Sequence, residues 1–121
     1  MTVSMHSLRD GYRALVIGAS GSIGQAFVGQ LRADPRCQEV VAISRGQPVA
    51  WDLGDPASLA DLPTRLQGPF HLVVDATGAL TLDGHGPEKR LDELEHDRLM
   101  RAMAVNAVGP ALLLRHLSPL L

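Results

Sequence analysis

Several residue types are scarce in this 121-residue chain, and each scarcity excludes something. A single cysteine, Cys37, cannot form an internal disulfide, which is typical of a reducing compartment. Aromatic residues make up only 3% of the chain, so its core must be built from aliphatic side chains. The formal net charge of −2 argues against a nucleic-acid partner, and no apolar run is long enough to span a membrane.

Neither the leading residues nor the histidines indicate a special function. Residues 1–11 lack the apolar stretch of a secretory signal, so we expect a cytoplasmic protein that makes no membrane contact. These residues are predicted to be a flexible lead, followed by one domain over residues 12–121. The five histidines show no metal-ligand spacing, and no metal site is predicted.

The remaining sequence alternates short apolar runs with segments of helical periodicity. Unbroken apolar runs are typical of strands buried on both faces of a parallel sheet. Strands are predicted at residues 14–17, 40–43, 49–51 and 71–74, and helices at residues 22–33, 56–66 and 96–117. Strands that alternate with helices predict an α/β fold with right-handed crossovers, as in a Rossmann-type doubly wound parallel sheet.

Two of the predicted helices have informative apolar faces. Ile23, Phe27 and Leu31 recur every four residues, so they should form the buried face of the first helix. The last helix has an apolar surface wider than one core-facing stripe needs. Contact with another copy of the chain through residues 96–118 would explain this surface, and so would a position between the sheet and further helices.

A glycine-rich turn, GASGSIG over residues 18–24, joins the first strand to the first helix. Gly18 permits a sharp turn, Gly21 lets a pyrophosphate approach the backbone, and Gly24 lets the helix pack closely. The first N–H groups of the helix then face the phosphates, while a turn that only connects two elements is the alternative. We therefore predict that a dinucleotide binds Gly18, Ser20, Gly21, Ser22, Ile23 and Gly24.

The end of the second strand indicates which dinucleotide this is. In a Rossmann fold this end lies beside the adenosine ribose, where an acidic residue binds the 2′-hydroxyl of NAD. The chain has Ser44 and Arg45 there, and a hydroxyl and a guanidinium suit a phosphate. We therefore predict that Ser44 and Arg45 bind NADP rather than NAD, unless Arg45 is only a solvated loop residue.

Together these residues resemble the short-chain dehydrogenase/reductase family. Gly18-x-x-Gly21-x-x-Gly24 is similar to the family's cofactor motif, in a spacing close to that of extended and atypical members. Asp52-Leu53 resembles the family's adenine-binding Asp–hydrophobic pair. The segment from Asp75 to Gly78 resembles the one that lies beside the adenosine ribose, although Asp75 stands where the family usually has Asn. The resemblance implies that the cofactor also contacts Asp52, Leu53, Ala76, Thr77 and Gly78.

The stretch from residue 105 to 110 resembles the family's asparagine-bearing helix. Pro110 lacks an N–H, so the carbonyl of Asn106 loses its helical partner and the helix should kink. In the family this asparagine positions a water for the catalytic lysine, which implies a catalytic role for Asn106. Together with Gly86-Pro87-Glu88-Lys89, this part of the sequence is similar to the branch that contains the bacterial C-factor proteins.

The family also uses a catalytic serine, and a tyrosine and lysine in a Tyr-x-x-x-Lys pattern. The only tyrosine here is Tyr12 and the only lysine is Lys89, and neither has that context. The chain therefore resembles the amino-terminal portion of such an enzyme, with an incomplete sheet. Three functions stay open: an NADP-dependent oxidoreductase acting on a carbonyl or alcohol, a non-catalytic NAD(P) sensor or signalling module, and an extended-type member acting on nucleotide sugars or flavin-like substrates.

Overall fold

The computed structural model of the protein describes residues 4–45 and 51–121. Three parallel strands form its sheet in the order β2-β1-β3, with bounds β1 (Tyr12–Ile17), β2 (Cys37–Ile43) and β3 (Leu72–Asp75). They correspond to the first, second and fourth predicted strands, so the α/β class and the central strand order are confirmed. The predicted strand at residues 49–51 lies outside the described residues except for Trp51, which belongs to no strand.

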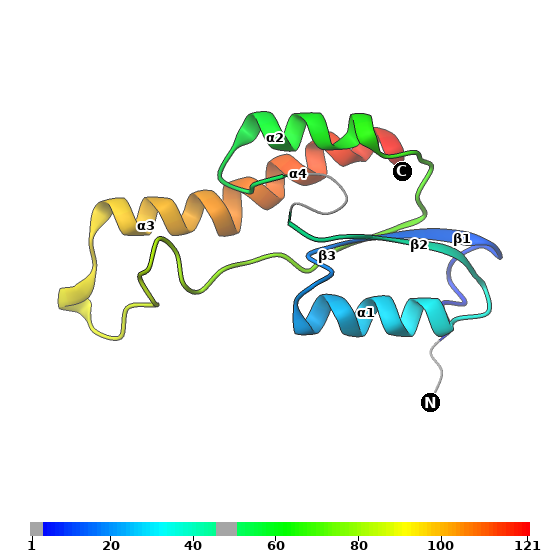
Figure 1. Cartoon of the computed structure of the whole chain (residues 1–121), viewed down its shortest axis with the longest axis horizontal. Helices are drawn as coiled ribbons and strands as arrows, with labels where there is room; N and C mark the ends of the chain where they lie inside the picture. Colours follow the sequence, from blue (N-terminus) through cyan, green and yellow to red (C-terminus); the bar gives the residue numbers. More distant parts are fainter. Residues whose placement is uncertain (1–3, 46–50) are drawn as a thin grey trace.

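Helices cover both faces of this sheet. Their bounds are α1 (Ser22–Ala33), α2 (Pro56–Asp61), α3 (His96–Met103) and α4 (Gly109–Leu117). Short 3-10 turns are η1 (Leu62–Arg65), η2 (Leu91–Glu93) and η4 (Ser118–Leu120), and η3 (Ala104–Val108) is a π-helical turn between α3 and α4. Figure 1 shows α1 on one face of the sheet and α2 with α4 on the other, while α3 projects beyond the sheet.

Two apolar clusters hold these layers together. Side chains alternate along β1, so Leu15 and Ile17 face α2 and α4 while Ala14 and Val16 face α1. On the first face, β1 packs with Ile43, Trp51, Leu59, Leu62, Phe70, Leu113 and Leu117. On the second face, it packs with Ala19, Val28 and Leu31. The two clusters place the core on both sides of the central strand, as a parallel sheet requires.

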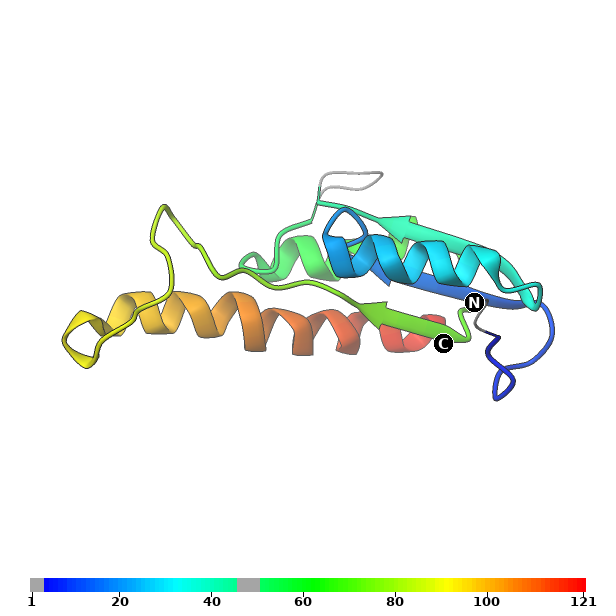
Figure 2. The ribbon, with the colours of Figure 1, turned by 90° about the horizontal axis from the view of Figure 1, so that it is seen from below.

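Helix α1 buries only part of the face predicted for it. Leu31 is buried as predicted, together with Gly24 and Val28, whereas Ile23 and Phe27 are 66% and 43% exposed. Gly24 lies on the buried face, where a Cβ would be 2.0 Å from the Gly18 carbonyl oxygen in the turn before the helix. Ile23 and Phe27 instead line an apolar groove with Leu72 and Val74 on β3. Figure 2 shows α1 lying along the sheet on this side.

The segment predicted as a flexible lead is packed against the domain over its described part, residues 4–11. Met5 and Leu8 join the cluster beneath α1. The buried Asp34 carboxylate accepts four hydrogen bonds, from the N–H groups of Met5 and Arg36 and from the hydroxyls of Ser4 and Tyr12. Burial would raise the pKa of Asp34, but these hydrogen bonds more than offset that effect and lower the pKa to about 2.

The helical stretch from α3 to α4 has an exposed apolar surface. Helix α3 has no buried residue, because it extends past the sheet. The exposed apolar side chains of this stretch are Leu99, Met100, Met103, Val108 and Leu114. No helix in the described part of the chain is long and apolar enough to cross a bilayer.

Replacing Asp34 with Asn should destabilise the protein in a pH-dependent way. The carboxylate has a folded-state pKa of about 2 against an ordinary value of 3.8. Its contribution to the free energy of unfolding is therefore complete above pH 3.8. That contribution is lost as the pH falls from about 4 through about 2. We expect Asp34→Asn to melt at a lower temperature than the wild type at pH 7, with a difference that shrinks below pH 4.

The control for this experiment is Asp61→Asn. Asp61 forms an exposed ion pair with Arg65, which contributes little to stability. Melting curves of the three proteins between pH 2 and pH 7 provide the comparison. A constant difference between Asp34→Asn and the wild type over this range would contradict the role of the ionised carboxylate.

Candidate functional site

The glycine turn follows β1 directly and is bonded to the end of β2. The N–H groups of Gly18 and Ala19 both donate to the carbonyl of Ile43, at 2.9 and 3.0 Å. Gly18 has a φ of 81°, in the left-handed region that favours glycine. A Cβ at Gly18 would lie 2.7 Å from the carbonyl oxygen of Ala76, just beyond β3. The turn therefore brings the ends of the three described strands together.

The other two glycines of the turn have different surroundings. A Cβ at Gly24 would lie 2.0 Å from the carbonyl oxygen of Gly18, so no side chain fits between α1 and the turn. A Cβ at Gly21 would find its nearest atom 3.7 Å away, again the Gly18 carbonyl oxygen. Gly24 thus serves helix packing, while Gly21 leaves space beside the backbone.

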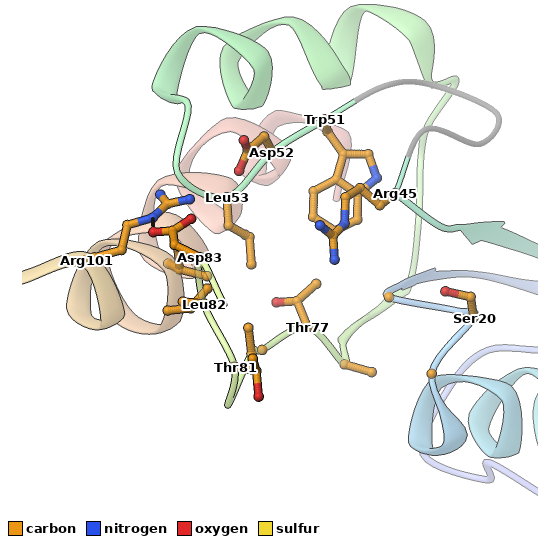
Figure 3. A pocket seen from close by; sticks show the side chains of 16 residues that line it. Ser20, Arg45, Trp51, Asp52, Leu53, Thr77, Thr81, Leu82, Asp83 and Arg101 are labelled. Carbon is orange, nitrogen blue, oxygen red and sulfur yellow. Dashed lines mark hydrogen bonds and ion pairs between the residues drawn. The ribbon is translucent and has the colours of Figure 1, made fainter. Parts of the chain in front are cut away.

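An open cavity of about 400 Å³ lies at the carboxyl ends of the strands (Figure 3). The predicted cofactor-binding residues that line it are Gly18, Ser20, Gly21, Arg45, Asp52, Leu53, Ala76, Thr77 and Gly78. The lining residues that the sequence did not predict are Trp51, Ala79, Thr81, Leu82, Asp83, Arg101 and Val105. The cavity therefore joins segments that are far apart in the sequence, at the edge where open α/β sheets bind ligands.

Five predicted site residues do not line this cavity. Ser22 and Ile23 line the apolar groove beside α1, and Gly24 lies on the buried face of that helix. Ser44 and Asn106 are hydrogen-bonded to Trp51 and Ala79, which do line the cavity. Ser22 still begins α1. The N-cap of this helix is Gly21, which has no side chain that could cap the first N–H groups. The first N–H groups of α1 therefore keep the positive end of a helix dipole open to an anion.

Arg45 and Trp51 lie on one side of the cavity, from segments on either side of residues 46–50 (Figure 3). The Trp51 indole N–H donates to the carbonyl of Ser44 at 3.1 Å. Arg45 is exposed, and no described carboxylate lies within ion-pair distance of it. A cation without a nearby acid suits an anionic ligand group.

The segment after Trp51 is held by a compact set of hydrogen bonds. The Asp52 N–H donates to the Ser58 hydroxyl at 2.9 Å, and this hydroxyl donates to the Asp52 carbonyl. The Asp52 carboxylate accepts from the N–H of Gly54 at 2.8 Å. Leu53 sits against α4, where a Cβ at Gly109 would lie 2.5 Å from the Leu53 carbonyl oxygen. This arrangement fixes Asp52 and Leu53 at the cavity wall.

The residues after β3 form a third wall of the cavity. The Asp75 carboxylate accepts hydrogen bonds from both the N–H and the hydroxyl of Thr77. The N–H of Ala76 donates to the carbonyl of Ile17 at 2.9 Å, which ties this segment to β1. An acceptor-only carboxylate can thus hold this backbone in the place of the Asn that the resemblance led us to expect.

Asn106 holds the loop that follows this wall. Its side-chain oxygen accepts from the Ala79 N–H at 2.8 Å, and its amide nitrogen donates to the Ala79 carbonyl at 2.9 Å. Asn106 lies in the π-helical turn η3, in which the Gly109 N–H donates to the Ala104 carbonyl. The predicted disturbance before Pro110 therefore takes the form of a π turn. The catalytic role of Asn106 stays a prediction.

Arg101 and Asp83 lie at the opposite end of the cavity from Ser20 (Figure 3). The Arg101 guanidinium donates to the Asp83 carboxylate at 3.2 Å. Sequence reasoning missed this pair because Asp83 belongs to an irregular loop. One signal was present: Arg101 and Val105 are four residues apart and therefore share a helix face.

Tyr12 and Lys89 are the only tyrosine and the only lysine of the sequence. Tyr12 is fully buried at the start of β1, and its hydroxyl donates to Asp34 at 2.7 Å. Burial raises the pKa of the Tyr12 hydroxyl, and the hydrogen bond to Asp34 raises it further. Lys89 lies exposed in the loop before η2. Neither residue lines the cavity.

Comparisons with known proteins bear on the fold. No protein-family model matches the sequence, and no curated protein matches it. Solved structures do match. A small-chain dehydrogenase in complex with NADPH has a TM-score of 0.73 and 19% identity, over 93% of this chain and 47% of its own.

Two further solved structures match most of this chain with about half of their own length. A mutant Serratia marcescens short-chain dehydrogenase/reductase has a TM-score of 0.67 and 24% identity, over 96% of this chain and 55% of its own. An NADH-dependent reductase complexed with NAD has a TM-score of 0.66 and 17% identity, over 95% and 53%. The chain has the fold of the short-chain dehydrogenase/reductases. It spans about half of the length of these three proteins.

Substitutions at Gly24 and Gly21 should separate folding from ligand binding. Gly24→Val drives a side chain into the Gly18 carbonyl, so we expect a loss of stability of at least about 3 kcal/mol. Gly21→Ala has room and a φ of −72°, so the protein should fold. Its methyl group should nevertheless weaken dinucleotide binding by about tenfold or more.

Thermal denaturation and calorimetric titration with NADPH measure the two effects. Gly29→Ala is the matched control, because a Cβ at Gly29 of α1 meets no neighbour within 4 Å. A Gly21→Ala protein that binds NADPH as tightly as the control would show that the turn does not contact the ligand.

Proposed function

We propose that this chain binds NADP(H) in the cavity at the carboxyl edge of its sheet. The observation that carries the proposal is the shared lining: the glycine turn, Arg45, Asp52 and Thr77 come from four separate segments and line one cavity. An anion site, a cation, an acid and small neutral residues are the groups that an adenine dinucleotide phosphate needs.

The turn and α1 would hold the pyrophosphate. Gly21 leaves the backbone open to a bulky anion, and the uncapped first turn of α1 faces it with N–H groups. Ser20 lines the cavity beside this turn and can donate its hydroxyl. In this proposal Ser22 and Ile23 contribute their backbone N–H groups, and Gly24 acts through packing.

The remaining walls would hold the adenosine half. Arg45 would pair with the 2′-phosphate, and Asp52 with Leu53 would bind adenine. The segment from Ala76 to Gly78 would lie along the ribose. Ser44 would act through its backbone, because its carbonyl accepts the Trp51 indole N–H.

The preference for NADP over NAD rests on Arg45. The similar structures include two with NADPH and one with NAD, so the fold alone selects neither cofactor. At the end of β2 this chain has a serine and an arginine, where NAD-binding sites use an acid. An unpaired guanidinium there favours a ribose that has a 2′-phosphate.

We further propose that the parent protein is an NADP-dependent oxidoreductase of the short-chain type. The cofactor, held by the glycine turn and Arg45, would supply a hydride to a carbonyl or accept one from an alcohol. This chain's own residues bind and orient the cofactor, and Asn106 positions the loop at Ala79. The serine, tyrosine and lysine that the family uses for proton transfer would come from outside this chain.

A non-catalytic NAD(P) sensor or signalling module is the second candidate. The observation that favours it is that none of the described lining residues is a tyrosine or a lysine. The purified parent protein, incubated with NADPH and a panel of aldehydes and ketones, distinguishes the candidates. Binding without oxidation of NADPH would favour a sensor, whereas oxidation would favour an enzyme.

The exposed apolar residues of α3 and α4 support a proposed homo-oligomer through residues 96–118. Met103 and Leu114 are 56% and 50% exposed, which is unusual for large apolar side chains of a stable monomer surface when several gather along one stretch. A second copy would bury them. A cytoplasmic location stays a prediction, which fractionation of cells expressing the protein tests.

Removing the Arg45 guanidinium should lower the affinity for NADPH and leave that for NADH nearly unchanged. A charge-assisted contact of this kind corresponds to a loss of about 10- to 100-fold. Titration calorimetry of Arg45→Ala with both cofactors measures this, and Arg115→Ala on α4 is the control. Equal affinity of Arg45→Ala and the wild type for NADPH would exclude the phosphate contact.

Introducing charge into the exposed apolar stretch should dissociate the oligomer. We expect the double variant Met103→Glu, Leu114→Glu to sediment as a monomer at concentrations where the wild type sediments as a larger species, because burying two carboxylates is costly. His96→Glu, at an exposed polar position at the start of α3, is the control. A wild type that is monomeric at all concentrations would contradict the proposed interface.

A further inference from the structure

Trp51 belongs to two environments at once. Its side chain is only 7% exposed and packs in the core cluster with Leu15 and Ile43, beneath α2 and α4. The same side chain also lines the cavity, on the side where Arg45 lies (Figure 3). A rigid buried ring is therefore in contact with the site that we assign to NADP.

The indole N–H connects this ring to the end of β2. It donates to the carbonyl of Ser44 at 3.1 Å, and Ser44 directly precedes Arg45. Buried indole N–H groups need a partner, so the contact fixes the backbone as well as the ring. The strand itself ends at Ile43, Ser44 forms one further β-bridge, and Arg45 is exposed. The indole hydrogen bond thus adds to the fixation of the backbone directly before Arg45.

A guanidinium on a freely moving backbone loses much entropy when it pairs with a phosphate. Holding the backbone beforehand reduces this cost and so increases affinity. Trp51 also directly precedes Asp52, which the Ser58 hydroxyl holds at the same cavity wall. One buried side chain therefore sets the spacing between the cation for the phosphate and the acid for the base.

We propose that Trp51 is a positioning residue for recognition of the ribose 2′-phosphate, acting through Ser44 and Arg45. This inference rests on the proposed NADP site. It assigns to a core residue part of the selectivity between two cofactors that differ only in one phosphate. A Trp51 that served the core alone would affect the binding of both cofactors equally.

The variant Trp51→Phe tests the assignment, because phenylalanine keeps an aromatic ring in the cluster and removes the N–H. We expect the affinity for NADPH to fall about tenfold, the affinity for NADH to change less than about twofold, and the fold to remain. In the double variant Trp51→Phe, Arg45→Ala, NADPH should bind no more weakly than in Arg45→Ala, because the two residues act through one contact.

The control is Phe70→Leu. Phe70 is a buried aromatic residue of the same cluster that does not line the cavity, so this change should lower stability and leave the NADPH to NADH affinity ratio unchanged. Equal losses for both cofactors in Trp51→Phe, no loss at all, or additive losses in the double variant would overturn the role of Trp51.

A measurement on the wild type covers the case in which Trp51→Phe does not fold. The chain has a single tryptophan, so its indole N–H gives one nitrogen-15 resonance. We expect slow exchange of this proton with water and a larger shift with adenosine 2′,5′-bisphosphate than with adenosine 5′-monophosphate. Fast exchange, or equal shifts, would overturn the inference. A wild type that binds neither NADPH nor the bisphosphate would overturn the proposed function itself, and this inference with it.

Discussion

The close approach of α1 to the glycine turn before it is the contact on which the packing of the helix against the sheet depends. Gly24 comes so close to the Gly18 carbonyl that no side chain fits between them. The helix that begins at this contact buries Val28 and Leu31 against the sheet. Gly21, directly before the helix, lines the cavity and leaves space beside its backbone. The glycines of one turn therefore allow both the close packing of α1 and the open wall of the cavity.

Local patterns predicted the parts of this structure that depend on local physics. The glycine turn and the three described strands follow from chain conformation and from apolar runs that are visible in the sequence. The buried face of α1 followed only at Leu31, because a spacing of four fits Ile23 and Phe27 as well as Gly24 and Val28. Only the tertiary contact at Gly24 distinguishes the two faces.

The candidate site shows the same division. The residues of the turn and of the strand ends could be predicted, since the carboxyl edge of a parallel sheet collects them. Trp51 and Arg101 could not, because they reach the cavity through packing and through an ion pair with a distant loop. The docking of residues 4–11 was likewise hidden, because it depends on Asp34, far along the chain. Sequence separation, rather than chemistry, limited the prediction.

The position of Trp51 has one practical consequence. Indole emission responds to the polarity and mobility of its surroundings, and this chain has no second tryptophan to blur that response. Because the one indole forms part of the cavity wall, the intrinsic fluorescence of the whole protein reports on a single place. The molecule thus carries a built-in optical probe, positioned where a ligand would arrive, without any label.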